Sequence, residues 1–247
     1  MIGIIAIQAR LSSTRLPGKV LFHLGQGYNA LSLLIARLKS NREINNNFKI
    51  CVLTSTNECD LAIVDWCISS NVDYILGSEN NVLERYYKVA TKFELPYVIR
   101  LTSDCPFSDP NEVLRVFNTC KDRNADFATN SFDGSSLVDG FDVEVMTREA
   151  VIKSFEEASR DDEFEHVTFY IRNNQGIFKC LFLDPQLCGS YRRLTLDTPQ
   201  DLKAIQSLVD LTGSDMVQKI SMSRLIDIAD KNNLFRLNNS LEKNHGW

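Results

Sequence analysis

Hydrophobic runs of strand length alternate with stretches of helical period over the first half of the chain. Four runs are rich in β-branched residues and nearly continuous, as expected of strands buried on both faces: residues 2–7, 48–55, 72–77 and 96–103. Apolar residues recur at three- and four-residue spacing in residues 28–40, 58–70, 81–93 and 111–123. This alternation predicts right-handed crossovers and an α/β fold, in which helices cover a mostly parallel sheet.

The pattern changes after about residue 132. Residues 140–146 alternate like a half-exposed strand, another strand is expected at 177–184, and helical periods are found at 148–159 and 162–174. We interpret residues 132–190 as a lobe inserted into, or appended to, the main sheet of a single domain spanning residues 1–247. A strand over 191–197 that ends in Asp197, a helix over 198–211 that opens with Thr-Pro, and one more helix with a polar tail complete the chain.

Composition excludes several classes of protein. The chain has 247 residues, 44% hydrophobic and 24% charged, which suits one large globular domain. Its net charge of −5 argues against a nucleic-acid or membrane-surface binder, because such proteins present a cationic field. The seven cysteines are odd in number and form no CxxC pair, which favours a reducing cytoplasm over a disulfide framework or a zinc site. The apolar run at residues 2–7 precedes its basic residues, unlike a signal peptide, and no run reaches membrane-spanning length.

One stretch departs from the acidic balance, because no Asp or Glu occurs before Glu43. Within it, residues 8–19 follow the first predicted strand and carry three cations and three hydroxyls: Arg10, Arg15 and Lys19 with Ser12, Ser13 and Thr14. Ligands of open α/β sheets bind at the carboxyl ends of strands, and these are the groups that hold phosphate. The stretch matches neither GxxxxGK[ST] nor GxGxxG. We interpret it as a phosphate site rather than a solvated basic loop, and we expect the cations on the tail of the next helix to be solvated: Arg37, Lys39 and Arg42.

Two carboxylates belong to the same predicted site. Asp104 and Asp197 each end a predicted strand, so in a parallel sheet both emerge at the edge that carries residues 8–19. Two carboxylates facing phosphates repel each other and the phosphates unless a divalent cation lies between them. Mg²⁺ is the natural ion, with Mn²⁺ as a substitute. The alternative is that Asp104 starts a turn and Asp197 caps a helix.

Several segments, in order along the chain, resemble one family. Residues 4–21, IIAIQARLSSTRLPGKVL, resemble the N-terminal signature of the cytidylyltransferases that activate acidic sugars, most closely the branch of spore coat polysaccharide biosynthesis proteins. Further matches to that branch are GSENNVLERYYKVA, VIRLTSDCPFSDP, GFDVEVMTREAV, EHVTFYIRN and LTLDTPQDL. The resemblance implies a Rossmann-like nucleotidyltransferase fold of GT-A-like type, CTP as donor, Mg²⁺ dependence and a homodimer built partly by the 132–190 lobe. Ser12 departs from the branch, which commonly has Gly there.

The motifs and the resemblance together give candidate roles. Catalytic roles are expected of Arg10, Lys19, Asp104 and Asp197, and the two aspartates are the candidate metal ligands. Nucleotide contacts are expected of Gln8, Ala9, Arg10, Ser12, Ser13, Thr14, Arg15, Lys19, Asn81, Val82, Arg85, Thr102 and Ser103.

The expected acceptor contacts are Asp142, Glu144, His166, Arg192 and Arg193. Each also has a plain structural interpretation. Asp142 and Glu144 can be the polar face of an amphipathic strand, and His166 a packed residue of an apolar helix. Of the two arginines, one is expected to face the sheet edge and hold an acceptor carboxylate or phosphate, and the other to face solvent.

The leading hypothesis is a cytoplasmic, Mg²⁺-dependent enzyme that transfers CMP from CTP to a sugar acid or related hydroxylated acceptor, releases pyrophosphate and serves surface polysaccharide biosynthesis. Its substrates are then small molecules, without nucleic acid or membrane partners. One rival is a glycosyltransferase that uses Asp142-x-Glu144 as the metal motif for a sugar nucleotide. The other is a nucleotide-binding protein without catalysis.

Overall fold

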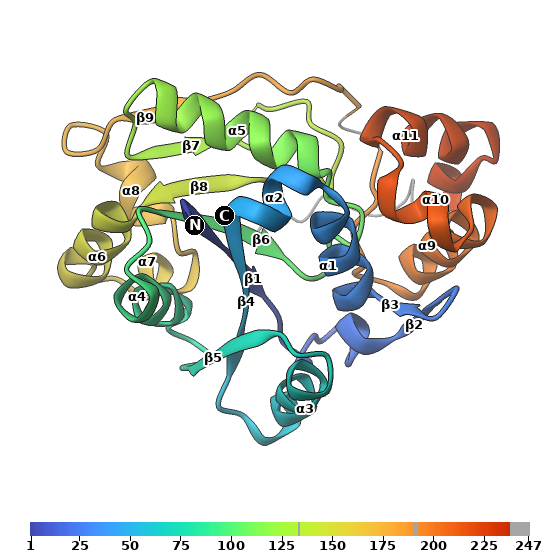
Figure 1. Ribbon diagram of the computed structural model, residues 1–247, viewed down its shortest axis with the longest axis horizontal. Coiled ribbons are helices and arrows are strands. Elements are labelled where there is room, and N and C mark those ends of the chain that lie inside the picture. The colour runs from blue at the N-terminus through green and yellow to red at the C-terminus, as the bar shows by residue number, and fades with distance from the viewer. Residues whose placement is uncertain (133, 190–191, 238–247) are drawn as a thin grey trace.

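The computed structural model describes residues 1–132, 134–189 and 192–237, and most of its strands belong to one sheet (Figure 1). Within these residues the sheet has seven strands in the order β5-β4-β1-β6-β8-β7-β9. Their bounds are β1 (Gly3–Gln8), β4 (Phe48–Ser55), β5 (Asp73–Gly77), β6 (Tyr97–Thr102), β7 (Phe127–Thr129), β8 (Glu144–Thr147) and β9 (Cys180–Phe182). Neighbours pair in parallel, except that β8 is antiparallel to β6 and β7. The predicted mostly parallel α/β sheet is confirmed, and its first four strands begin and end within one residue of the prediction.

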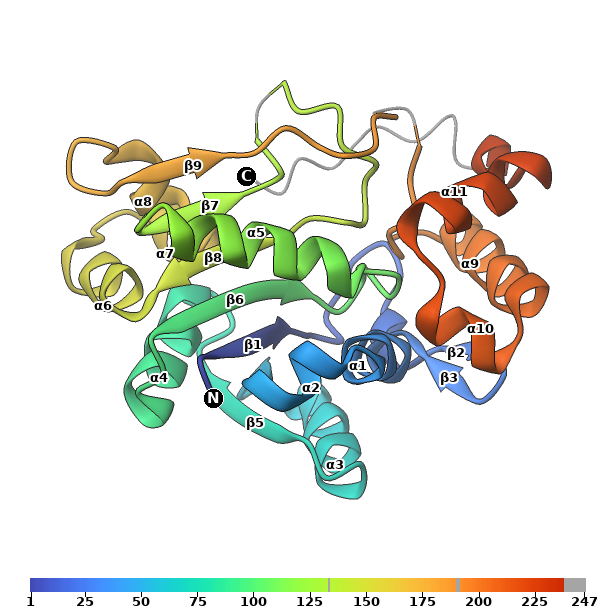
Figure 2. The same cartoon turned by 45° about the horizontal axis from the view of Figure 1, so that its top comes forward.

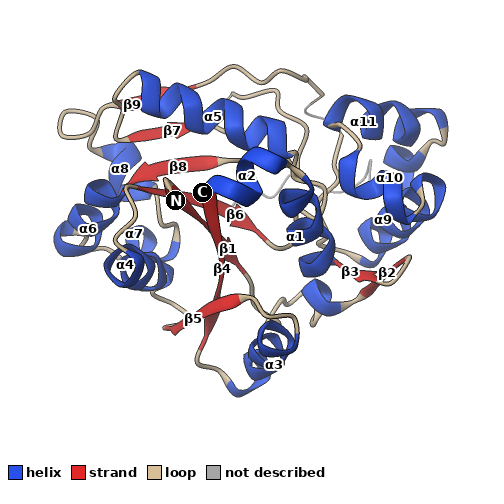
Figure 3. Ribbon diagram, in the orientation of Figure 1, coloured by secondary structure: helices blue, strands red, loops and turns tan. Residues whose placement is uncertain are grey.

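Helices cover both faces of this sheet (Figure 3). On one face lie α1 (Ala30–Ser40), α2 (Arg42–Asn47), α3 (Leu61–Ser69) and α5 (Pro110–Asp122). On the other lie α4 (Val82–Phe93), α6 (Arg148–Glu157), α7 (Asp161–Glu165) and α8 (Phe169–Asn173). The side chains of β1 divide between the two, because successive residues of a strand point to opposite faces. Ile5 and Ile7 pack in the first core, and Ile4 and Ala6 in the second.

A third core lies beside the sheet, where the C-terminal helices meet a small hairpin (Figure 2). The helices are α9 (Pro199–Thr212), α10 (Ser214–Lys219) and α11 (Met222–Lys231), and the hairpin is β2 (His23–Gly25) with β3 (Tyr28–Asn29). Three 3₁₀ turns complete the described elements: η1 (Lys19–Leu21), η2 (Glu58–Asp60) and η3 (Leu234–Leu237). The helix over 199–212 begins as its Thr-Pro start predicts, because the Thr198 and Asp201 side chains bond each other's backbone N–H groups.

Arg37 corrects one expectation. It was predicted to be solvated, but it is completely buried between α1 and the C-terminal helices. Its guanidinium donates to the backbone oxygens of Ser108, Val217 and Ile220 over 3.2, 2.5 and 2.9 Å. Burial lowers the pKa of Arg37 to about 10. Periodicity cannot reveal such a site, since its acceptors come from segments far along the chain.

The second half of the chain departs further from the prediction. The strand over 140–146 begins only at Glu144, and it is buried instead of half-exposed, because helices cover both of its faces. The single helix over 162–174 is two helices, since Val167 has a left-handed backbone with φ of 36° and interrupts the helical hydrogen bonds. The strands of the 132–190 segment, β8 and β9, pair within the main sheet.

The predicted strand over 191–197 is absent from its described part, residues 192–197. These residues run extended along other loops and bury Leu194 and Leu196 in the third core. Their N–H groups donate to the Asp139 and Asp104 backbone oxygens, each over 2.8 Å. Residue 191 and the predicted polar tail over 238–247 lie outside the described residues. Among the helices that are described, none has the length and apolarity needed to cross a membrane.

Candidate functional site

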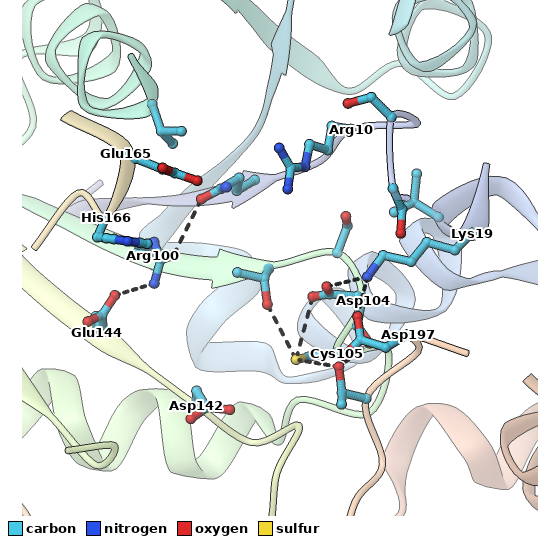
Figure 4. Close-up of a pocket in the computed structure, with 18 of the residues that line it drawn as sticks. Arg10, Lys19, Arg100, Asp104, Cys105, Asp142, Glu144, Glu165, His166 and Asp197 are labelled. Atoms are coloured by element: carbon cyan, nitrogen blue, oxygen red, sulfur yellow. Dashed lines mark hydrogen bonds and ion pairs between the residues drawn. The ribbon is translucent and has the colours of Figure 1, made fainter. Parts of the chain in front are cut away.

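A cavity of about 880 Å³ opens at the carboxyl ends of β1 and β6 (Figure 4). One half of its wall, here called the loop half, is drawn from side chains within residues 8–20, 78–82 and 102–105, with Thr195 and Asp197. The other half, here called the lobe half, comes from β6 residue Arg100 and from residues between Ser131 and Glu144 and between Asp161 and His166. Most predicted site residues line the cavity: Gln8, Arg10, Ser12, Ser13, Thr14, Arg15, Lys19, Asn81, Val82, Thr102, Ser103, Asp104, Asp142, Glu144, His166 and Asp197. Ala9, Arg85, Arg192 and Arg193 lie outside its lining.

The loop after β1 is closed by local turn chemistry. Gly18 has φ of 78°, a conformation that costs glycine little, and its N–H donates to the Leu11 backbone oxygen over 2.9 Å. Lys19 follows at once as the first residue of η1, and its side chain is 9% exposed. The Pro17-Gly18 sequence therefore turns Lys19 inward, toward the end of β6.

Lys19 joins the two predicted metal ligands. Its Nζ lies 2.7 Å from Asp104 Oδ2 and 2.7 Å from Asp197 Oδ1. Burial by itself lowers the pKa of Lys19, but the two carboxylates outweigh it and the net pKa is raised. Burial likewise favours a high pKa for Asp104, and the neighbouring Lys19 more than offsets it, so that pKa is lowered. Lys19 and Asp104 are therefore both charged at neutral pH.

A second layer of ion pairs fixes Asp197. Its Oδ1 lies 3.0 Å from Arg15 Nη2, and its Oδ2 accepts from Arg193 Nη2 over 2.6 Å. Arg193 in turn donates to both carboxylate oxygens of buried Asp201, over 3.1 Å each. Asp201 also accepts the Asp197 backbone N–H over 2.9 Å. The helix start and the ion pairs together hold the Asp197 carboxylate in one orientation.

The donor set fits a small divalent cation. Asp104 and Asp197 direct oxygens at one point, the position of the Lys19 ammonium, and carboxylate oxygens are what Mg²⁺ prefers. No group of three or more His, Cys, Asp or Glu suited to a metal exists among the described residues. An ion held by this pair would take its remaining ligands from water or substrate oxygens, as is usual for Mg²⁺ at phosphate sites.

Arg85 lies in the first turn of α4, directly after the 78–82 segment, and does not line the cavity. It is 1% exposed, and its Nε and Nη1 have no hydrogen-bond partner among the described residues. Gly77 makes room for it, because a Cβ there would stand 2.6 Å from Arg85 Cγ. Burial lowers the pKa of Arg85. An unsatisfied buried donor of this kind is costly and commonly marks a site completed by another group.

Ser12 links the loop after β1 to the segment after β5. Its hydroxyl donates to Glu79 Oε1 over 2.6 Å, and Asn57 donates to Glu79 Oε2. These hydrogen bonds lower the pKa of Glu79 and keep it ionised. The Ser12 departure from the family pattern therefore adds a link between two segments of the loop half.

At the far end of the cavity, Glu144 forms ion pairs with two arginines, of which Figure 4 shows Arg100. It is 2% exposed and lies 2.5 Å from Arg100 Nη1 and 2.9 Å from Arg172 Nη2, while Thr168 Oγ1 donates to it over 2.7 Å. Burial favours a high pKa for Glu144, but the two arginines prevail and the pKa is lowered. Asp142 is half-buried, and its Oδ2 accepts the Gly140 N–H over 3.4 Å.

The other predicted acceptor residues divide between the cavity and its surroundings. His166 lines the cavity, but as the residue that ends α7 and not as part of one long helix. Arg192 points toward the C-terminal helices, where its Nη2 lies 2.7 Å from Asp230 Oδ2. Arg193 is buried behind Asp197, and Ala9 is buried with its N–H bonded to Leu53 O over 2.9 Å.

Sequence reasoning missed several lining residues: Glu79, Arg100, Cys105, Asp139, Asp161 and Glu165. Arg100 gave a usable signal, since a lone charge inside an apolar strand needs a buried partner. Glu79 follows β5 by two residues and was open to the same carboxyl-end argument as the first loop. Burial raises the pKa of the Cys105 thiol well above its usual range, so it stays protonated and is a poor nucleophile.

Solved structures with a similar fold include several enzymes. A cytidylyltransferase from Leptospira borgpetersenii is 28% identical, with a TM-score of 0.87 over 98% of this chain and 100% of that chain. A CMP:2-keto-3-deoxy-manno-octonic acid synthetase complexed with CTP is 17% identical, with a TM-score of 0.61 over 85% of this chain and 99% of the other. The fold is thus that of the Rossmann-like nucleotidyltransferases, as predicted.

The sequence matches are more specific. A family model for cytidylyltransferases matches residues 4–237. An uncharacterised protein of Methanocaldococcus jannaschii is 33% identical over 237 residues, 94% of this chain and 91% of that protein. The spore coat polysaccharide biosynthesis protein SpsF of Bacillus subtilis is 32% identical over 230 residues, 92% of this chain and 93% of that protein. The chain belongs to the cytidylyltransferase family, and the resemblance found in its sequence is confirmed.

Proposed function

We propose that this protein transfers CMP from CTP to a sugar acid or a related hydroxylated acceptor and releases pyrophosphate. The observation that carries the proposal is the meeting of Lys19, Asp104 and Asp197 at the cavity floor in a chain of the cytidylyltransferase family. The acceptor oxygen attacks the α-phosphorus of CTP and its proton passes to solvent water, while the bond from that phosphorus to the oxygen it shares with the β-phosphate breaks and pyrophosphate leaves. The name of the Bacillus subtilis relative supports a role in surface polysaccharide biosynthesis.

The loop half supplies the charge that this transfer needs. Arg10, Arg15 and Lys19 line the same wall and neutralise the β- and γ-phosphates and the departing pyrophosphate. Asp104 and Asp197 would hold Mg²⁺ or Mn²⁺, which when bound neutralises charge on the α-phosphate and the attacking oxygen. The ion pairs among Arg193, Asp201 and Asp197 keep the second carboxylate oriented before substrate arrives, as efficient catalysis requires.

Arg85 and its neighbours are the proposed nucleobase site. Asn81 and Val82 line the cavity within one helical turn of the buried Arg85, whose Nε and Nη1 find no partner in the described part of the chain. Cytosine offers ring-nitrogen and carbonyl acceptors that suit such donors. The Ser12–Glu79 hydrogen bond holds the loop after β1 beside the 78–82 segment, so the proposed binding sites of base and triphosphate are linked to each other.

The charges of the lobe half indicate which part of the acceptor it would bind. Asp142, Asp161 and Glu165 line it and form no ion pair with a described residue. Carboxylates accept hydrogen bonds from sugar hydroxyls and repel phosphate. In the cyclic hemiketal form of a 2-keto sugar acid, the carboxylate is bonded to the anomeric carbon that carries the reacting hydroxyl. We therefore propose that the acceptor carboxylate lies toward the cationic loop half, and its hydroxylated tail toward the lobe half.

The rival glycosyltransferase reading needs Asp142 and Glu144 to share a metal. Glu144 is instead bound by Arg100, Arg172 and Thr168, and both of its oxygens are engaged. This arrangement supports the cytidylyl transfer and disfavours an Asp-x-Glu metal motif. We also propose that the enzyme is a homodimer, to be checked by light scattering on the eluting peak of a sizing column.

The test is a pyrophosphate-release assay over four nucleoside triphosphates and a panel of sugar acids, sugar phosphates and tail-phosphorylated sugar acids. We expect release with CTP and an unphosphorylated sugar acid, and at least tenfold less with the tail-phosphorylated form. No release with any pairing, despite CTP binding, would favour the binding protein without catalysis.

Variants then assign the release to the site. Removing one preorganised charge typically costs about 3 kcal/mol of transition-state stabilisation, roughly a hundredfold in rate. Lys19→Met and Asp104→Asn should each lose about this much, whereas Lys49→Met, which removes a surface ion pair with Asp73, should not. Near wild-type turnover in either site variant would remove that residue from the mechanism.

A further inference from the structure

The point at which the two candidate metal ligands meet is already filled by a cation. Lys19 Nζ lies 2.7 Å from an oxygen of each carboxylate, and its side chain is 9% exposed. Asp197 also contacts Arg15 and Arg193, over 3.0 and 2.6 Å. Lys19 therefore pairs with both carboxylates, and Arg15 and Arg193 add positive charge around Asp197, with Arg193 shared with Asp201 and Asp139.

We propose that Lys19 keeps this metal site closed to free divalent cations, and that it opens only when the phosphates of a nucleotide draw the lysine away. A divalent ion placed between Asp104 and Asp197 would stand against the Lys19 ammonium in a partly buried site, where like charges repel more strongly than in water. The carboxylates meanwhile gain little from the ion, because their charge is already balanced.

The lysine can leave without dismantling the site. Its stem is flexible and begins at a turn, directly after Gly18, on the wall that faces the substrate. Asp197 stays fixed by Arg193 and by the helix start at Asp201. When Lys19 moves onto phosphate oxygens, two oriented carboxylates remain with one cation fewer.

Metal and nucleotide binding are then coupled. A nucleotide that withdraws Lys19 raises the affinity of the carboxylates for the ion, and by linkage the ion raises the affinity for the nucleotide by the same factor. The inference rests on the proposed function only for the identity of the nucleotide, because closure by Lys19 is a property of the free protein.

The experiment measures Mn²⁺ binding to the full-length protein without nucleotide, by the loss of the free-ion electron paramagnetic resonance signal. Lys19→Met keeps the length of the side chain and removes its charge, so we expect at least tenfold tighter Mn²⁺ binding than in the wild type. Lys19→Arg, which retains the charge, and Lys49→Met, which removes a distant surface ion pair, should bind as weakly as the wild type. Adding Asp104→Asn to Lys19→Met should abolish the gain.

Thermal unfolding gives a readout independent of turnover. Saturating Mn²⁺ should raise the Tm of Lys19→Met by about 3 °C and leave that of the wild type nearly unchanged. Wild-type protein that binds Mn²⁺ without nucleotide as tightly as Lys19→Met overturns the inference, as does binding by Lys19→Met that Asp104→Asn leaves intact. If Lys19→Met does not fold, the wild type alone decides: saturation of wild-type protein by micromolar Mn²⁺ without nucleotide overturns the inference. Loss of CMP transfer with these binding results unchanged contradicts only the proposed function.

Discussion

Glu144 and Asp142 were both expected to contact the acceptor, but the structure predicts different effects of their substitution. Replacing Glu144 should lower stability, whereas replacing Asp142 should weaken acceptor binding. Glu144 Oε2 pairs with Arg100, while Oε1 accepts from Arg172 and Thr168. Glu144→Gln keeps the shape but turns one oxygen into an amide NH₂ that faces a donor. Breaking a buried ion pair by removing one partner costs about 3–5 kcal/mol. For a chain of this length that corresponds to a Tm lower by roughly 10 °C.

The assay is urea unfolding followed by circular dichroism, with Asp142→Asn as the matched control. Asp142 is half-buried and forms no ion pair with a described residue, so its substitution should change the free energy of unfolding by no more than about 0.5 kcal/mol. Asp142→Asn should instead raise the KM for the acceptor. Stability losses below about 1 kcal/mol for Glu144→Gln, or equal losses in both variants, would refute the reasoning.

Three further predictions concern stability and its link to the site. Arg37→Met should lower the free energy of unfolding in urea by about 3 kcal/mol, because three buried backbone oxygens lose their donors. Lys39→Met, on the exposed side of the same helix, should leave it almost unchanged. Similar losses in the two variants would contradict the role of Arg37. Asp201→Asn should lower kcat more than it raises the KM for CTP, since it loosens the support of Asp197; an unchanged kcat would argue against this. The folded-state pKa of Glu144 is depressed, so its contribution to stability is present above its unfolded pKa of about 4.3 and is lost as the pH falls below that value. Tm should therefore decline at acid pH less steeply in Glu144→Gln than in the wild type. Equal slopes of Tm against pH would contradict this.

The first half of the fold followed from local pattern. Four buried strands and the helices between them have strong, continuous periods, and parallel strands with short crossovers leave little freedom in their arrangement. The place of the cationic loop at the cavity followed for the same reason, since the loop comes directly after the first strand at the sheet edge where ligands bind.

The second half of the fold was harder to predict from the sequence, because its short elements depend on partners from elsewhere in the chain. β7 and β9 are three residues long and β8 is four, too short for a firm period. The segment before Asp197 has the alternation of a strand, yet its Leu194 and Leu196 are buried in a side core and it joins no strand of the sheet. Asp197 still reaches the site, because the Leu196 N–H is bonded to the Asp104 backbone oxygen.

The sequence by itself determined the kind of sheet, the position of the cationic loop and the edge at which two carboxylates meet it, since these depend on periodicity and on strand ends. Only the tertiary structure decided what each charge does. Arg37 binds backbone oxygens from two distant segments, Glu144 lies between two arginines, and Lys19 occupies the point between Asp104 and Asp197. The interaction of a charge depends on its neighbours in space and on the water they exclude, and the one-dimensional pattern contains neither.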